Sequence, residues 1–427
     1  METLLSLAIA LFAGLMLSRL AKLVQLPAVT AYLVAGILIG PFCLGRIGVS
    51  GLGFDEDLLD SLGIISDVAL GFIAFSIGNE FRLSQIKKIG KQATLIGVFQ
   101  AVFTTLVVDA ALIALSFIIP DNKFPLPAAL IMGAIASATA PAATLMVVRQ
   151  YKAKGPVTDV LLPVVALDDA VGLVLFSISF GAAKALIAGQ VSVLAIVVEP
   201  IIEVVLSVAL GTGMGYLFSF FERFFHSRSK RLAMSVAFVF LTVAISMIDN
   251  IYIGEVHIAF SPLLSCMMLG TIFCNICDFS EELMDRLDRW TAPIFILFFV
   301  ISGAELDFNV FADYIVIIIG VVYILFRSLG KYFGANISAR LAKSEPNIKK
   351  YLGITLLPQA GVALGMAIKA GALGGTIGII ISSLTLFSVL IYELIGPFLT
   401  KVALSKAGEI NPEGKVSARA KTEQNNQ

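Results

Sequence analysis

The chain has 427 residues, of which 58% are hydrophobic and 14% are charged. Soluble domains are about 45 to 50% apolar, so this composition excludes an ordinary soluble protein and indicates one embedded in a lipid bilayer. Thirty basic and thirty acidic side chains balance. The net charge therefore gives no reason to expect a nucleic-acid partner, and none is predicted.

About thirteen apolar stretches follow one another along the chain, and each is predicted to be a membrane helix. A hydrocarbon core about 30 Å thick needs about 20 residues of helix to cross it. The first stretch lacks the basic start and the cleavage site of a signal peptide, so it is predicted to be a retained span. The stretches lie at approximately residues 4–23, 28–45, 62–79, 92–119, 126–148, 157–188, 190–221, 232–248, 252–275, 290–304, 309–335, 348–371 and 374–401.

The predicted fold class is an all-α polytopic membrane protein with one membrane domain over residues 1–404. Residues 405–427 are polar and are predicted to form a short disordered tail. Lys and Arg accumulate on the cytoplasmic side of membranes, and here they cluster in alternate loops and in the tail. This pattern predicts an external N-terminus, a cytoplasmic C-terminus and a location in the cell (plasma or inner) membrane.

No cofactor is predicted. Cys274 and Cys277 form a lone CxxC pair, and a structural zinc site needs a second ligand pair at a fixed spacing. The two histidines, His226 and His257, are far apart in the chain. Metal chemistry is therefore expected only for a transported ion.

The fifth and twelfth predicted spans share an interruption. "ASATAPAATLM" places Ser137 and Thr139 before Pro141, and "TLLPQAGVALG" places Gln359 after Pro358. Proline removes a backbone donor and clashes with the preceding turn, so each helix is predicted to unwind near mid-membrane. An offset of seven spans makes the second copy inverted, and broken helices at matching places in inverted repeats indicate a transporter. A simple packing kink is the alternative.

The sixth span carries two adjacent acids, Asp168 and Asp169, in "VVALDDAVGLVLF". One acid at the centre of a membrane helix costs about 3 kcal/mol on insertion scales, so such residues are functional by default. Adjacent helical residues point about 100° apart, so one acid is expected to face an aqueous cavity and the other the broken helices. A proton and a monovalent cation would compete for these carboxylates. Thr139 and carbonyls near Ala138 are the further oxygen ligands expected.

Other charged residues in the spans are less informative. Arg327 and Lys331, one turn apart in the eleventh span, are interpreted as interfacial anchors, with an ion gate as the alternative. Lys331 is also a candidate supporting residue of the ion site. A further group is interpreted as lying near span ends, where a charged head can reach water. Its members are Asp109, Lys184, Glu199, Glu203, Lys369 and Glu393.

Five motifs together resemble the monovalent cation:proton antiporter superfamily across nearly all of the first 400 residues. They are "LPAVTAYLVAGILIGP", "GFIAFSIGNEFRL", "SATAPAAT", "ALDDAVG" and "LLPQAGVALGMA". The resemblance implies the sodium/proton antiporter fold, with inverted repeats and two broken crossing helices. It also implies the two-aspartate branch, in which Asp169 carries the cation and the proton, Asp168 is its partner, and Thr139 lines the ion site. Such proteins form homodimers in which a mobile core moves against a static dimerisation domain.

One departure from the family pattern stands out. Many electrogenic relatives have a lysine, on the helix that corresponds to span 10 or 11, paired with the first aspartate. "PIFILFFVISGAELDF" has Ser302 and Glu305 and no lysine. On this interpretation electrogenic transport is in question, and no positive group balances Asp168.

The predicted function is exchange of a monovalent cation for H⁺ by alternating access, with Na⁺ as the expected cation and K⁺ and Li⁺ as alternatives. A sodium-coupled symporter of an organic solute shares the broken-helix architecture. A cation channel is disfavoured because no pore-lining filter repeat occurs. An intramembrane aspartyl protease needs acids that converge from separate helices, whereas Asp168 and Asp169 are adjacent.

Overall fold

The computed structural model describes most of the chain. The described residues are 2–23, 28–41, 43–44, 54, 56–119, 124–140, 144, 147–148, 151–189, 198–225, 227–248, 251–253, 256–277, 279–306, 312–371 and 373–410.

The described part of the chain is a bundle of helices, as predicted. Nine of them are long and apolar enough to cross a membrane, and four shorter ones are equally apolar. The helices are α1 (Glu2–Leu23), α2 (Ala28–Ile39), α3 (Glu56–Glu80), α4 (Leu83–Ile118), α5 (Leu126–Ala136), α7 (Pro156–Ile187), α8 (Glu199–Glu222), α9 (Arg228–Ser246), α10 (Pro262–Ile276), α11 (Ser280–Ala304), α12 (Tyr314–Leu341), α13 (Pro346–Thr355), α14 (Gly361–Gly371) and α15 (Gly375–Lys406). Each predicted span overlaps with one described helix, or with the pair α13 and α14. Of the fifth span, only residues 126–140, 144 and 147–148 belong to the described part of the chain.

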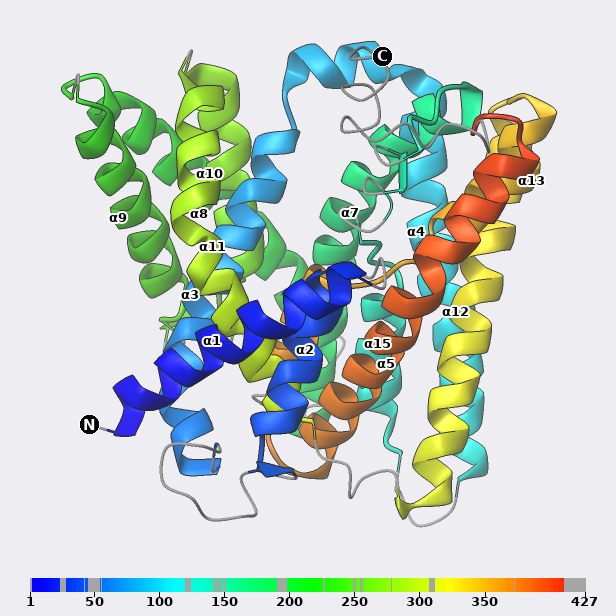
Figure 1. Cartoon of the computed structure of the whole chain (residues 1–427), viewed down its shortest axis with the longest axis horizontal. Coiled ribbons are helices and arrows are strands. Elements are labelled where there is room, and N and C mark those ends of the chain that lie inside the picture. The colour runs from blue at the N-terminus through cyan, green and yellow to red at the C-terminus, as the bar shows by residue number, and fades with distance from the viewer. Residues whose placement is uncertain are drawn as a thin grey trace, which may run out of the picture.

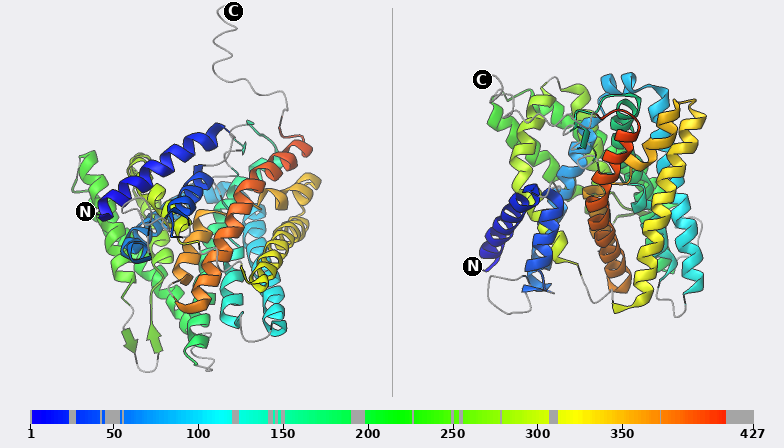
Figure 2. Two further views of the ribbon diagram at one scale, coloured as in Figure 1. Left: turned by 60° about the horizontal axis from the view of Figure 1, so that its bottom comes forward. Right: turned by 45° about the vertical axis from the view of Figure 1, so that its right-hand side comes forward.

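The structure differs from the prediction at several helix ends. The stretch expected to begin a helix at 252 instead forms a hairpin of β1 (Ile251–Ile253) and β2 (Val256–Ile258), which projects from one end of the molecule (Figure 2). Its alternating β-branched and aromatic residues fit a strand better than a helix. Helix α11 begins ten residues before the predicted 290, because the polar "SEELMDRLDR" has no apolar signal to reveal it.

The last helix also ends slightly beyond the predicted 404. Helix α15 continues to Lys406. The Glu409 carboxylate then accepts hydrogen bonds from the backbone N–H groups of Val157 and Thr158 at the start of α7, at 2.6 and 2.8 Å. Glu409 and Ile410 are buried, so the chain packs against the helices as far as Ile410. The remainder of the predicted tail, 411–427, lies outside the described residues.

The helices pack as two groups (Figure 1). In one group, here called the scaffold helices, α3 and α8 pack on α10, and α2 packs on α1 and α11; α9 completes it. In the other, here called the core helices, α4 packs on α5, α7 and α12, α14 packs on α15, and α13 packs on α12 and α15. Helix α7, which carries both aspartates, borders the scaffold through α8.

Four glycines bring the scaffold helices into backbone contact. Each lies against a carbonyl of the facing helix, so that an added Cβ would come within 1.9 to 2.2 Å of that oxygen. The glycine and carbonyl pairs are Gly36/Val300 and Gly303/Leu33 between α2 and α11, and Gly78/Met267 and Gly270/Phe75 between α3 and α10. In every pair the oxygen belongs to the residue three before the partner glycine. With an offset of seven spans, α2 corresponds to α10 and α3 corresponds to α11. The same glycine contact therefore occurs in both copies of the inverted repeat.

Replacing Gly36 by Ala is expected to destabilise the scaffold helices. The new Cβ would lie 1.9 Å from the Val300 carbonyl oxygen, and the backbone of α11 has no soft side chain there to move aside. Overpacking of this kind costs about 1 to 3 kcal/mol. Gly63→Ala in α3 is the matched control, because nothing lies within 4 Å of its added Cβ. Melting of the detergent-purified proteins measures the difference; equal melting temperatures for the two variants would contradict the packing argument.

Candidate ion-binding site

The two predicted helix breaks are present and touch each other. Helix α5 ends at Ala136, and residues 356–360 separate α13 from α14. The Ala140 N–H donates to the Pro358 carbonyl at 2.8 Å. The break at Pro358 is thus confirmed, and so is unwinding of the other span at 137–140. Pro141 itself lies outside the described residues.

Gln359, in the break between α13 and α14, forms hydrogen bonds to the other broken helix. Its amide nitrogen donates to the Ile135 carbonyl at 3.0 Å, near the end of α5, and lies 3.2 Å from the Tyr323 hydroxyl. The Thr139 hydroxyl reaches the Leu356 carbonyl at 3.3 Å in return. The two unwound segments are therefore tied to one another by side chains as well as by backbone.

Arg327 donates hydrogen bonds to backbone carbonyl groups at the two helix breaks. Its guanidinium donates to the carbonyls of Ala136, Ala138 and Leu357 at 3.0, 2.7 and 2.8 Å, and it lies 4.3 Å from the centre of the Tyr392 ring. Helix C-termini carry a partial negative charge, which this fixed cation offsets. The Ala138 carbonyl, expected to be a cation ligand, is thus an acceptor for Arg327.

Asp168 lies at the centre of a buried polar cluster. None of its surface is exposed, and its carboxylate is 2.6 Å from the Lys331 ammonium. The Thr139 hydroxyl and the Gln100 side-chain amide also donate to it. Lys331 in turn donates to the Ser137 carbonyl and to the Gln100 amide oxygen. Asp168 is therefore balanced by a charge and held by two further donors.

Asp169 lies beside this cluster and is 1% exposed. The Lys331 ammonium, already paired with Asp168, also attracts Asp169 electrostatically. The expectation that one acid faces an aqueous cavity is not met in this conformation, because both carboxylates are closed off from solvent. The two acids Asp168 and Asp169 and the two basic side chains Arg327 and Lys331 are thus all buried, and the opposite charges balance as burial requires.

The interpretation of Arg327 and Lys331 as interfacial anchors is wrong. Both side chains have no exposed surface, and Lys331 lies ten residues, or about 15 Å of helix, before the end of α12. Gly330 and Gly334 pack directly on Thr104 and Gln100 of α4, which buries this face of α12. The expectation that no positive group balances Asp168 is therefore also wrong. Lys331, in the eleventh predicted span, pairs with Asp168.

The structure does not bring every predicted residue to the acids. Ser302 is buried, and its hydroxyl donates to the Phe298 carbonyl of its own helix at 2.7 Å. The Ser137 hydroxyl likewise donates to Ala134, although its carbonyl serves Lys331. Glu393 is also not near a span end, because it lies midway along α15 and is 1% exposed. Gln100, in contrast, was missed: a lone amide in "GVFQAVF" gives no signal until its partners are known.

The cluster suits a monovalent cation and a proton. The Asp168 and Asp169 carboxylates and the Thr139 hydroxyl supply the oxygen ligands that hard cations prefer. Among the described residues, no group of three His, Cys, Asp or Glu side chains could hold a resident metal ion. Buried acids beside two crossing broken helices, in an inverted repeat, define the class as an ion-coupled secondary transporter.

The comparison with protein families gives the same class. The model of the sodium/hydrogen exchanger family, transmembrane, matches residues 7–406. The chain therefore belongs to the sodium/hydrogen exchanger family, and it is a membrane transporter rather than an enzyme. Among curated proteins, no sequence matches the chain.

Two solved structures of the sodium proton antiporter MjNhaP1 from Methanocaldococcus jannaschii resemble the chain. The structure at pH 8 has a TM-score of 0.71 and 18% sequence identity, and the match covers 95% of this chain and 100% of that one. An electron-microscopy structure gives a TM-score of 0.66 and 17% identity, with 95% and 98% covered. At these identities the likeness establishes the fold.

Proposed function

We propose that Asp169 and Asp168 carry the exchanged cation and protons, with Thr139 as an additional ligand. Na⁺ is the expected cation, and K⁺ and Li⁺ are the alternatives. The observation that carries the proposal is the buried ion pair of Asp168 and Lys331, 2.6 Å long, next to Asp169 at the crossing of two broken helices. A charge pair of this kind is costly to bury, and it provides a reversible balance for a carboxylate that must bind and release a cation.

The ion pair supports an exchange of two protons for one cation. A cation that binds the two carboxylates displaces the Lys331 ammonium from Asp168. An ammonium buried without its partner is unfavourable, so Lys331 releases a proton. Asp169 releases the second, because cation and proton compete for the same oxygens. Net charge then crosses the membrane in each cycle, and this supports the proposal that the chain is of the electrogenic, two-aspartate kind.

The two helix groups support alternating access. The core helices carry the whole charged cluster, and they move as a unit against the scaffold helices in this proposal. The scaffold forms the contact in a homodimer. The N-terminus is external and the C-terminus cytoplasmic, since the basic loops gather on the side where α7 begins. The chain acts in the cell (plasma or inner) membrane.

The ion profile of proton exchange in everted vesicles tests this function. Addition of Na⁺ is expected to dissipate an imposed pH gradient, and the rate is expected to change with an imposed membrane potential. Uptake of sodium that requires an organic solute would identify a symporter instead. Flux that does not saturate and ignores the pH gradient would identify a channel.

A further inference from the structure

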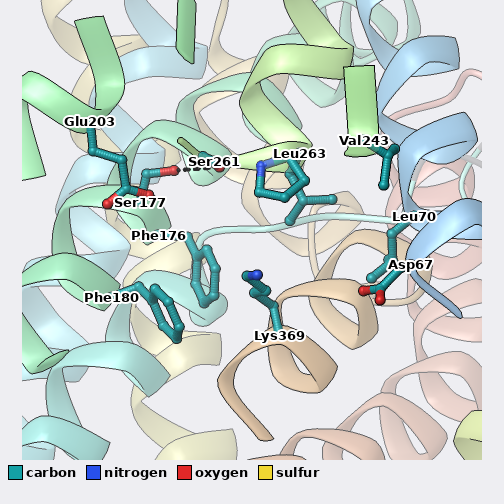
Figure 3. Close-up of a pocket in the computed structure, with 11 residues that line it drawn as sticks. Asp67, Leu70, Phe176, Ser177, Phe180, Glu203, Val243, Ser261, Leu263 and Lys369 are labelled. Carbon is teal, nitrogen blue, oxygen red and sulfur yellow. Dashed lines mark hydrogen bonds between the residues drawn. The ribbon is translucent and has the colours of Figure 1, made fainter. Parts of the chain in front are cut away.

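A small cavity of about 20 Å³ lies between the core and the scaffold helices. Three charged residues line it: Asp67 of α3 and Glu203 of α8 from the scaffold, and Lys369 of α14 from the core. Figure 3 shows the Lys369 amine extending toward the middle of the cavity and the Asp67 carboxylate on the scaffold side. The ammonium attracts Asp67 electrostatically. Neither group belongs to the aspartate cluster described above.

The cavity lies further along α7 than Asp169, toward the C-terminal end of that helix. Phe176, Ser177 and Phe180 of α7 line it, and they follow Asp169 by seven to eleven residues. At 1.5 Å per residue they lie about 10 to 16 Å further along the helix, on the side opposite the basic loops. An ion that moves between Asp169 and that side of the membrane along α7 passes this cavity.

The cavity wall is also where the two helix groups meet. The Ser177 hydroxyl of α7 lies 3.1 Å from the Ser261 hydroxyl at the start of α10, a contact drawn in Figure 3. On the next turn of α7, Gly181 approaches Pro200 of α8 so closely that an added Cβ would lie 2.8 Å from its ring. Movement of the core against the scaffold must therefore change the distance between Lys369 and Asp67.

We propose that the Lys369 ammonium is a tethered competitor of the transported cation on this side of the membrane. It attracts Asp67 electrostatically across the cavity, and an incoming cation must share the cavity with it. Lys369 thereby sets the apparent cation affinity from this side. The proposal rests on the proposed function, because it takes Asp169 as the destination of the cation.

Electrostatics gives the direction and the size of the effect. Clefts with low-dielectric walls focus the field of their charges and change the local concentration of ions by 10-fold or more. A fixed ammonium in such a cleft repels a monovalent cation, whereas Asp67 alone would attract it. Removal of the ammonium is therefore expected to lower the KM for the cation on the order of ten-fold. Removal of the Asp67 charge acts in the opposite direction.

The test compares the two faces of the membrane. Lys369→Gln is expected to lower the KM for Na⁺ about ten-fold in right-side-out vesicles, with no change in everted vesicles, and Asp67→Asn is expected to raise it on the same face. Lys369→Arg, which keeps the charge, should behave as the wild type. An unchanged KM for Lys369→Gln on both faces, with exchange intact, would overturn the proposal. Absence of exchange in the wild type would instead refute the proposed function.

A chemical rescue covers the case in which Lys369→Gln does not fold. Lys369→Cys is made in a Cys43→Ser background, because Cys43 is the exposed one of the four cysteines. An aminoethyl methanethiosulfonate restores an ammonium at this site, and a methyl methanethiosulfonate adds a neutral group of similar chemistry. The KM is expected to rise to the wild-type value with the aminoethyl group only. An equal rise with both reagents would show that bulk, not charge, matters, and would also overturn the proposal.

Discussion

Asp169→Asn is expected to abolish cation-dependent proton exchange in everted vesicles. Asparagine matches the shape of aspartate but neither ionises nor carries a proton, so it offers the cation no charge and the proton no site. Asp169 is 1% exposed, and no solvent replaces the missing charge. The loss of a buried charge contact costs about 3 kcal/mol or more, which corresponds to a loss of affinity of at least about 100-fold.

The matched control for this variant is Asp159→Asn. Asp159 lies on the same helix, ten residues before Asp169, and is exposed. Its replacement is expected to leave the exchange rate within about two-fold of the wild type, in keeping with the small effects of surface substitutions. Sodium-driven dissipation of the pH gradient that persists undiminished in Asp169→Asn would remove Asp169 from the mechanism. A loss of exchange in both variants would point to damage of α7 as a whole.

Much of the fold follows from local patterns. Hydrophobic runs of bilayer length locate the spans, and the two prolines mark the breaks because proline acts on its own helix. The acids at 168 and 169 stand out for the same reason, since an ionisable residue in an apolar run is conspicuous without knowledge of its neighbours. The hairpin at 251–258 was missed, because short apolar runs do not distinguish strand from helix.

The partners of Asp168 could not be found in this way. Lys331 is 163 residues away in the chain, and its position in α12 resembles that of any lysine near a span end. Lys331 is buried because α4 packs against Gly330 and Gly334. This contact joins segments that are distant in the sequence. The two glycines that flank Lys331 are the only local hint, since small residues mark the packing faces of membrane helices. Gln100 and Glu393 were missed or misplaced for the same reason.

Lys331→Gln is expected to lower both the stability of the protein and the voltage dependence of exchange. The variant leaves Asp168 buried without its ion pair, which costs about 3 kcal/mol and should lower the melting temperature by several degrees. Exchange then has no ammonium to release its proton, so one proton rather than two is expected for each cation. The rate of the variant should become independent of an imposed membrane potential.

A double variant separates the lost charge from general damage. Asp168→Asn combined with Lys331→Gln removes both members of the pair, so it should melt above Lys331→Gln alone, because no unpaired buried charge remains. Lys350, in the middle of α13, is exposed, and Lys350→Gln should match the wild type in both assays. If Lys331→Gln keeps its voltage dependence while its melting temperature falls, the ion pair serves stability alone. The second proton must then come from another group.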